Sequence, residues 1–319
     1  MGSTEQARKE TAQAIREACI NYGFFYLDIS SHVDAIETEE LVRLAREFFV
    51  LPQEEKDRLS LRNEDHARGY SRLGQSITAG KVDKHEELDF FRPVENPDKT
   101  KVCWGNNQWP TVEGFWDKYK IWIEKMKVLG RVVMEAMAEG LGLTAEERET
   151  LRSLVNGSFW AMGVIGYPPL PDDHDGISFG SHKFLHTDST PGALQVYLHK
   201  LPNNDNNSEY AGKGQWINVD PIPGCVVCNI ASMFEIWTNG LYKSTLHRVI
   251  HKGTNYRISI PFFFEPNFNA LVEPLPSVIA LTESINEEQL GRTYEPVVYG
   301  EFLVKKVKNN FLPDIGKYA

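Results

Sequence analysis

The chain has 319 residues, of which 41% are hydrophobic and 24% are charged, a composition typical of a globular protein with a sizeable core. Its formal net charge of -10 disfavours binding to nucleic acids and to anionic membranes. No apolar stretch approaches the roughly 20 residues of a membrane-spanning helix, and the N-terminus lacks the apolar segment of a signal peptide. Four cysteines are too few for a disulfide framework, which favours the reducing environment of the cytoplasm. We also expect the protein to be a monomer.

The N-terminal part of the chain shows helical patterns interrupted by one short strand. Ser3 and Gln6 form a capping box, which predicts a helix that begins there and runs to about Tyr22. Residues 24–27, all apolar or aromatic, predict a short buried strand. A second helix is expected over residues 36–50, before a proline.

The middle of the chain combines a polar segment with a long helix. Residues 53–108 are rich in charge and are expected to be irregular. A long amphipathic helix is predicted from about Thr111. Its apolar residues recur every three or four positions and should face the core, namely Phe115, Tyr119, Trp122, Met126, Leu129 and Val133.

The chain after Leu154 has the pattern of a β-rich region. Runs of β-branched and aromatic residues alternate with glycine, proline and asparagine, which predicts many short strands and hence a sandwich or barrel. Residues 202–214 are polar and predict a hairpin loop, and residues 297–310 predict a final helix. The predicted strands lie in SFWAMGVIGY, GALQVYLH, GQWINV, CVVCNI, STLHRVI and YRISIPFFF.

Two cysteines, Cys225 and Cys228, form a C-x-x-C motif that could suggest half of a zinc site or a redox pair. A step of three residues along a strand places the side chains on opposite faces, and the sequence has no second C-x-x-C. We therefore interpret the motif as a strand that contains two small apolar thiols.

The motif His186-Thr187-Asp188 places an imidazole and a carboxylate on the same side of a predicted strand, where both can bind one metal ion. A third ligand can come from His247, in the strand-like segment STLHRVI. Two histidines and one carboxylate on one side of an ion leave the other positions open, an arrangement suited to Fe(II) oxygenases. By itself the motif is weak, because each histidine could equally be an ordinary core or surface residue.

Arg257 and Ser259 strengthen this interpretation. They share one face of the predicted strand YRISIPFFF, and an arginine fork beside a hydroxyl suits the binding of a carboxylate. An acid that chelates the metal at one end could be held by this pair at the other end. The alternative is an ordinary ion pair between Arg257 and an acidic side chain.

The order H-x-D, distal histidine, R-x-S resembles the isopenicillin N synthase-like branch of the Fe(II)/2-oxoglutarate-dependent dioxygenases. The resemblance covers nearly the whole chain, and its landmarks occur in the family's order. They are INYGFFYL, EFFVLPQEEK, ARGYSRLG, GYPPLP, PIPGCVVCNI, IWTNGLYKSTLHRV and RISIPFFFEPN.

The resemblance implies an α+β fold, with a double-stranded β-helix (jelly-roll) core wrapped by N-terminal helices and a C-terminal helix. It implies that His186, Asp188 and His247 bind Fe(II). Arg257 and Ser259 match the positions that bind the far carboxylate of 2-oxoglutarate, and Tyr167 in GYPPLP matches a tyrosine that often assists them. No catalytic residue beyond the metal centre is expected.

The resemblance also implies a reaction and a domain organisation. Fe(II), 2-oxoglutarate and O2 would hydroxylate or desaturate a small organic metabolite and give succinate and CO2. Residues 1–319 would form a single catalytic unit: a mainly helical region (1–155), the jelly-roll core with the metal site (156–270), and a C-terminal segment and helix (271–319).

The sequence departs from the family's pattern in three places. It begins almost directly in a helix, where relatives usually open with a short strand. Ile165 stands where many plant members have asparagine, and Ala231-Ser232 stands where many have Gly-Asp. None of these departures affects the three predicted ligands or the R-x-S motif.

Residues of the substrate pocket can be predicted only in outline. Phe263 shares a strand face with Arg257 and should point to the substrate. Phe184, two residues before His186, is expected to line the substrate pocket as well. Arg68 and Tyr70 in ARGYSRLG belong to an N-terminal region that often covers the pocket in relatives. Aromatic side chains would suit a small, partly apolar molecule.

Three alternatives remain open at the level of sequence. The first is an Fe(II) oxidase of the same fold that does not use 2-oxoglutarate, as in isopenicillin N synthase itself. The second is a non-catalytic small-molecule binding protein, which is expected to lose a ligand or the clamp; here all five residues are present. The third, a hydrolytic zinc enzyme, lacks a helical H-E-x-x-H motif.

Overall fold

The computed structural model describes most of the chain. The described ranges are 4–78, 81–169, 177–179, 185–188, 190–198, 214–285, 291 and 293–310, with only the backbone described for 78, 177–179, 185–188 and 285. Two predictions lie outside these ranges: the hairpin loop at 202–214, except for its last residue, and the side chain of Phe184. No helix in the described ranges is long and apolar enough to cross a membrane.

The N-terminal elements are α1 (Glu5–Asn21), β1 (Phe24–Asp28) and α2 (Ala35–Phe49), which confirms the predicted helix, strand and helix. The cap of α1 was predicted one residue too early. The hydroxyl of Thr4, in extended backbone, accepts a hydrogen bond from the backbone N–H of Ala7. The capping box of the region instead opens α2, where Asp34 and Glu37 cap each other's backbone.

The segment 53–108 was wrongly expected to be irregular. It contains two short helices and four strands, and two of these strands, β2 and β5, lie in the largest sheet. The charged residues hid the strands because carboxylates on β5 are paired inside the protein, whereas sequence reasoning assigns them to solvent. The elements are α3 (Gln53–Asp57), η1 (Leu61–Asn63), β2 (Gly69–Ser71), β3 (Ile77–Thr78), β4 (Lys81–Val82) and β5 (Glu86–Phe91).

The long helix α4 (Phe115–Gly140) begins four residues later than predicted, after Gly114, whose positive φ of 78° suits glycine. All six residues of its predicted apolar stripe are buried, which confirms their role in the core. A shorter helix, α5 (Ala145–Val155), follows and opens with a capping box at Thr144.

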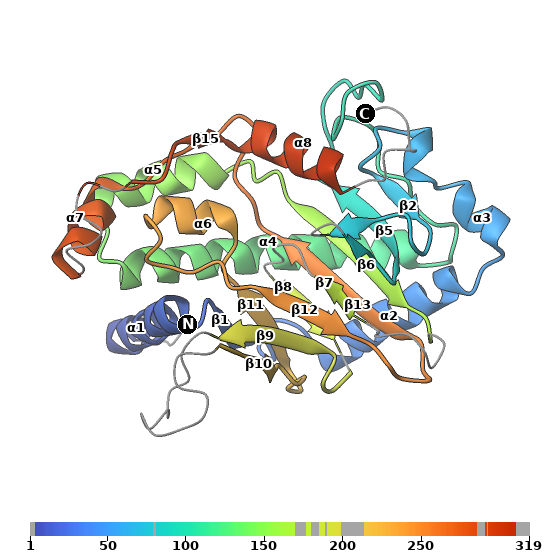
Figure 1. The fold of residues 1–319 in the computed structure, drawn as a ribbon, viewed down its shortest axis with the longest axis horizontal. Coiled ribbons are helices and arrows are strands. Elements are labelled where there is room, and N and C mark those ends of the chain that lie inside the picture. Colours follow the sequence, from blue (N-terminus) through green and yellow to red (C-terminus); the bar gives the residue numbers. More distant parts are fainter. Residues whose placement is uncertain are drawn as a thin grey trace.

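Two antiparallel sheets form the centre of the described structure. The larger has the order β1-β11-β8-β13-β6-β5-β2 and the smaller has the order β10-β9-β12-β7. Figure 1 shows these strands in the middle, with α1, α5, α6 and α7 at one end and α3 at the other. The new strands are β6 (Ala161–Tyr167), β7 (Ile177–Phe179), β8 (Leu185–Asp188), β9 (Leu194–Leu198), β10 (Gln215–Asn218), β11 (Cys225–Asn229), β12 (His247–Ile250) and β13 (Arg257–Phe263).

The larger sheet has two faces with different surroundings. The inner face carries Ile165, Tyr167 and Val227, which pack against residues of the smaller sheet such as Val196 and Val249. The outer face belongs to a larger hydrophobic cluster with side chains of α1, α2 and α4. Cys225 and Cys228 point to opposite sides of β11, and both are free thiols, as the strand interpretation predicted.

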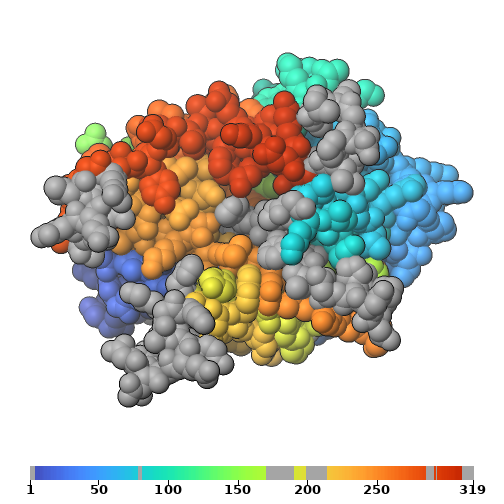
Figure 2. All heavy atoms as spheres, viewed as in Figure 1, coloured from blue at the N-terminus to red at the C-terminus, as the bar shows by residue number. Residues whose placement is uncertain are grey.

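The C-terminal part packs across the strands. Its elements are α6 (Ser232–Trp237), β14 (Leu271–Val272), α7 (Pro276–Ile285), β15 (Val297–Val298) and α8 (Tyr299–Asn309), the last of which confirms the predicted final helix. The backbone N–H of Ile77 donates a hydrogen bond to the carbonyl oxygen of Asn310 at 2.8 Å. In Figure 2 the red surface of α8 accordingly lies beside the cyan surface of the β2–β5 region.

Candidate active site

The H-x-D motif lies on β8, between β11 and β13 in the larger sheet. His186 pairs with Val227 on one side and Pro261 on the other, and Asp188 pairs with Ser259. Directly opposed residues of an antiparallel pair share a face, so His186 is on the inner face with Val227. The backbone therefore places both predicted ligands on the inner face, while their side chains lie outside the described set.

His247, the third predicted ligand, approaches from the smaller sheet. It lies on β12, opposite Val196, and is only 2% exposed. Its Nδ1 lies 3.3 Å from the carbonyl oxygen of Thr245, and its ring packs edge-on against Phe24 with 5.4 Å between centroids. A backbone contact at one ring nitrogen is the usual way to orient a histidine whose other nitrogen binds a metal.

These residues fit a metal site in type and position. The backbone positions of His186 and Asp188 on β8 and the buried side chain of His247 on β12 lie on strands whose partner residues Val227 and Val196 share one apolar cluster between the two sheets. Among the side chains that the structure describes, no three metal-ligating groups come together, because two of the three predicted ligands are outside that set. A His–Asp–His set on one side suits Fe(II) with open positions for a chelating ligand and O2.

The predicted carboxylate clamp lies next to the H-x-D motif. Ser259 pairs with both Asp188 and Ile165, and Arg257 pairs with Tyr167. The guanidinium carbon of Arg257 lies 4.4 Å from the centre of the Tyr167 ring, and Arg257, Ser259 and Tyr167 are each at most 3% exposed. A guanidinium buried this deeply requires acceptors, and a dicarboxylate bound at the metal would present one here.

The predicted substrate residues do not gather in one place. Phe263 ends β13 on the face of Arg257, as expected from strand alternation. Arg68 is fully buried instead, where it forms an ion pair with Asp65 and donates a hydrogen bond to the carbonyl oxygen of Arg92. Tyr70 is on the outer face, paired with Leu88, so its ring points away from Arg257. These contacts favour structural roles for Arg68 and Tyr70.

Sequence reasoning missed the contribution of β5 to the inner face. Its burial alternates along Glu86–Phe91: the outer-face residues Glu86, Leu88 and Phe90 are buried, whereas Glu87 and Asp89 are half-buried. His85, just before the strand, packs its ring against Tyr167 at 5.4 Å and has its Nε2 3.4 Å from a Glu87 oxygen. The alternation of EELDFF was the signal, obscured by the charge of its surroundings.

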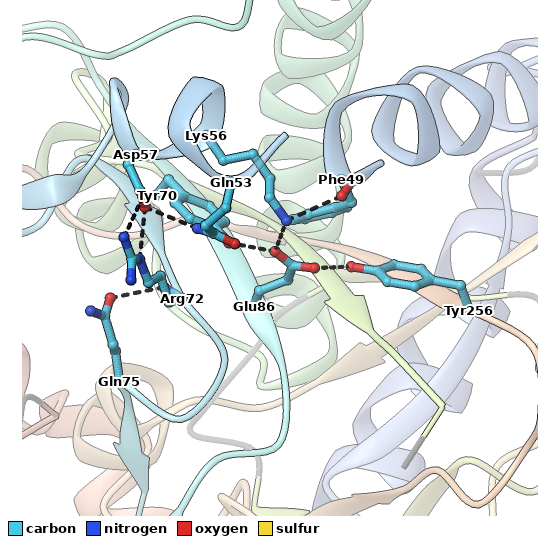
Figure 3. Close-up of polar contacts among 9 residues, drawn as sticks. All are labelled: Phe49, Gln53, Lys56, Asp57, Tyr70, Arg72, Gln75, Glu86 and Tyr256. Carbon is cyan, nitrogen blue, oxygen red and sulfur yellow. Dashed lines mark hydrogen bonds and ion pairs between the residues drawn. The ribbon is translucent and has the colours of Figure 1, made fainter. Parts of the chain in front are cut away.

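Behind the clamp, on the outer face, a buried polar network surrounds Glu86 (Figure 3). Its carboxylate accepts hydrogen bonds from Lys56 at 2.7 Å, Tyr70 at 2.5 Å and Tyr256 at 2.6 Å. Burial, followed by the nearby carboxylate, raises the pKa of both tyrosines, so both hydroxyls stay protonated and donate. The network links the α2–α3 corner to the residue just before Arg257.

A cavity of about 470 Å³ lies elsewhere, along α4. Arg92, Trp109, Trp116 and Trp160 are among its lining residues, and none of the predicted metal or clamp residues lines it. It is separate from the site described here.

Comparisons with known proteins agree with this geometry. Residues 1–112 match the family described as non-haem dioxygenase in morphine synthesis N-terminal, and residues 153–266 match the 2OG-Fe(II) oxygenase superfamily. The chain is 35% identical over 312 residues to homoarginine-6-hydroxylase 2-ODD-233 of Oryza sativa subsp. japonica, covering 95% of this chain and 90% of that protein.

The chain belongs to the 2-oxoglutarate–Fe(II) oxygenase superfamily. Within it, the chain belongs to the isopenicillin N synthase-like branch, as the sequence motifs implied. This oxygenase is also 34% identical to homoarginine-6-hydroxylase 2-ODD-C23.1 of Arabidopsis thaliana, with 95% of this chain and 90% of that protein covered.

Solved structures place this oxygenase in the same fold. A full-length Neurospora crassa protein, solved in complex with alpha-KG, matches with a TM-score of 0.74 and 26% identity, over 96% of this chain and 92% of that one. Fe(II) and 2-oxoglutarate are therefore the cofactor and cosubstrate of this oxygenase. Membership of this superfamily disfavours the three alternatives left open by the sequence. These were a same-fold oxidase without 2-oxoglutarate, a non-catalytic binding protein and a zinc hydrolase.

Proposed function

We propose that this oxygenase hydroxylates, or desaturates, a small organic metabolite in a reaction that converts 2-oxoglutarate to succinate and CO2. The pairing of Asp188 with Ser259 carries the proposal, because it sets the metal-binding strand directly beside the clamp strand. A five-carbon diacid that chelates the metal can then reach the clamp with its far carboxylate.

Each residue has a specific task in this scheme. His186, Asp188 and His247 hold Fe(II), which together with bound 2-oxoglutarate supplies the oxidising chemistry with O2. Arg257 and Ser259 fix the far carboxylate of 2-oxoglutarate. Tyr167 supports the Arg257 guanidinium with the face of its ring.

The hydrophobic wall around these residues has a second task, which is to exclude water. Ile165, Leu194, Val196, Val227 and Val249 form an apolar cluster between the sheets. Low polarity strengthens the electrostatic contacts of the clamp and limits side reactions.

We also propose that the two sheets form a double-stranded β-helix and that residues 1–319 act as one catalytic unit. The support is a single hydrophobic cluster with side chains from α1, α4, β13 and α8. No separate core divides the helical part from the larger sheet within the described ranges.

The relatives give a first substrate to test. Since proteins named homoarginine-6-hydroxylase are 34–35% identical to this chain, we propose L-homoarginine as a candidate substrate. The experiment measures succinate release and O2 uptake by the Fe(II)-loaded protein with 2-oxoglutarate, with and without L-homoarginine and other small metabolites. Absence of an iron–keto-acid absorption band on adding 2-oxoglutarate, with no succinate from any mixture, would overturn the proposed reaction.

A further inference from the structure

Two carboxylates on the inner face of β5 are not used by the metal or the clamp. Glu87 and Asp89 are two residues apart on one strand, so both point to the inner side of the sheet. Their outer-face neighbours Glu86 and Leu88 are 7% and 0% exposed, whereas Glu87 and Asp89 are half-buried. Two half-buried carboxylates on the inner face place negative charge on the same side of the sheet as the metal site.

The sheet places these carboxylates on the same side of β8 as the clamp strand, with β13 and β6 between β8 and β5. Asp89 pairs with Gly163, and a Cβ atom at Gly163 would lie 2.7 Å from a Glu87 oxygen and 3.4 Å from an Asp89 oxygen. The same Cβ would lie 3.4 Å from the Pro261 ring, and Pro261 pairs with His186. Glycine therefore keeps side chains out of the space between the two carboxylates and the metal-binding strand.

An independent observation points to a polar ligand on the opposite side of the predicted metal-binding strand, at β11. Asn229 ends β11 and is 1% exposed, and neither its amide oxygen nor its amide nitrogen has a hydrogen-bond partner among the described residues. It lies two residues beyond Val227, on the inner face, and pairs with Phe24, whose ring contacts His247. A buried amide without partners destabilises the fold, and a bound ligand that hydrogen-bonds to it can offset that loss.

We propose that the substrate carries a cationic amino or guanidino group, which Glu87 and Asp89 bind, and a second polar group, which Asn229 binds. The proposal rests on the proposed function and names the substrate class of that site. Carboxylates match the donors of a guanidinium or ammonium group, and a cation that leaves water needs such paired charge. His85, 3.4 Å from Glu87, orients that carboxylate as a positioning residue.

The three residues would also place the substrate relative to the metal. Asn229 is on β11, on one side of β8, while Glu87 and Asp89 lie beyond β13 and β6 on the other side. A molecule held at both positions would cross in front of the metal-binding strand. This arrangement would present a C–H bond between its polar groups to the iron.

The first test uses unmodified Fe(II)-loaded protein with 2-oxoglutarate, without O2, and measures binding by calorimetry and by the change in the iron–keto-acid absorption band. L-Homoarginine, L-arginine and L-lysine are the cationic probes, and L-homocitrulline is the uncharged analogue of L-homoarginine. We expect at least one cation to bind, and L-homoarginine to bind about 10-fold or more tightly than L-homocitrulline. Equal affinity for those two, or no binding by any cation while the band forms, would overturn the proposal. Failure of the band itself would instead contradict the proposed function.

The second test uses variants. Asp89→Asn and Glu87→Gln should each weaken binding of the tightest cationic probe about 10-fold or more, with unchanged affinity for 2-oxoglutarate. Glu95→Gln, at an exposed acid beyond β5, is the control and should bind as wild type. Wild-type affinity in both charge-neutralising variants would refute the role of the pair.

Asn229→Leu separates ligand binding from a structural role. Replacing an unsatisfied buried amide by an apolar group of similar size should maintain or raise the midpoint of thermal unfolding. The same change should lower the affinity for the tightest cationic probe. A lower midpoint with unchanged probe affinity would mean that Asn229 acts only in the fold.

Discussion

The two faces of the larger sheet use the same types of residue for opposite purposes. On the outer face the Glu86 carboxylate is enclosed by Lys56, Tyr70 and Tyr256, each of which donates to it. On the inner face, one residue further along β5, Glu87 is half-buried on the side of the sheet that carries the predicted metal ligands. A carboxylate surrounded by donors stabilises a packed junction, whereas one beside an interior space can bind a ligand.

The same contrast holds on β13. Tyr256 points to the outer face and closes the Glu86 network, while the next residue, Arg257, points to the inner face above Tyr167. Because strand residues alternate between faces, a single step along the chain passes from a stabilising contact to a residue of the proposed ligand site. Neighbouring residues therefore provide matched pairs with which the comparison can be tested.

The largest effect is expected at the metal site on the inner face. His247→Ala removes one of the three predicted ligands, so bound iron and succinate formation should both fall by more than the roughly 10–100-fold typical of changes to groups that only orient ligands. Iron content by elemental analysis and succinate release measure this. Near-normal iron content would remove His247 from the ligand set.

The next effect contrasts the two neighbours on β13. Arg257→Gln removes the guanidinium, so KM for 2-oxoglutarate should rise by about 10-fold or more. Tyr256→Phe removes one hydroxyl on the other face, so the free energy of unfolding should fall by about 1 kcal/mol while KM stays unchanged. Kinetics and urea denaturation of both variants test whether Arg257 acts in 2-oxoglutarate binding and Tyr256 in stability. A large rise of KM in Tyr256→Phe would contradict this assignment.

A third prediction contrasts the two glutamates of β5. Glu86→Leu leaves the buried Lys56 without its ion-pair partner, so the free energy of unfolding should fall by about 3 kcal/mol or more. Glu87→Gln, on the inner face, should change it by less than about 1 kcal/mol. Denaturant titration of both variants measures the difference. Similar losses in the two would show that the inner-face carboxylate is also structural.

A fourth prediction concerns pH. Glu265 follows β13, and burial raises its pKa from 4.5 to about 8. The folded protein therefore retains this proton where the unfolded chain has lost it, so the residue's contribution to stability falls as pH rises from about 4.5 to 8. Glu265→Gln should flatten the decline, by at most about 1.4 kcal/mol per pH unit. Unfolding curves at several pH values check this, and an unchanged slope would contradict the assignment.

Local patterns carried much of the fold and of the site. Runs of β-branched and aromatic residues indicated β6 and β13, and the three-to-four-residue spacing indicated α4. The predictions from the H-x-D and R-x-S motifs rest on the rule that residues two apart on a strand share a face, which needs no knowledge of neighbouring strands. The structure adds that the strands of these two motifs pair with each other.

Only the tertiary structure decided which strands became neighbours and which face each side chain joined. β5 pairs with β6 across about 70 residues of sequence, and that pairing brings Glu87 and Asp89 to the inner face. The pairing of β2 with β5 places Tyr70 on the outer face, whereas the sequence had suggested that Tyr70 lines the substrate pocket. Sequence determines alternation along a strand, but the burial that makes one side a core and the other a binding site depends on long-range packing.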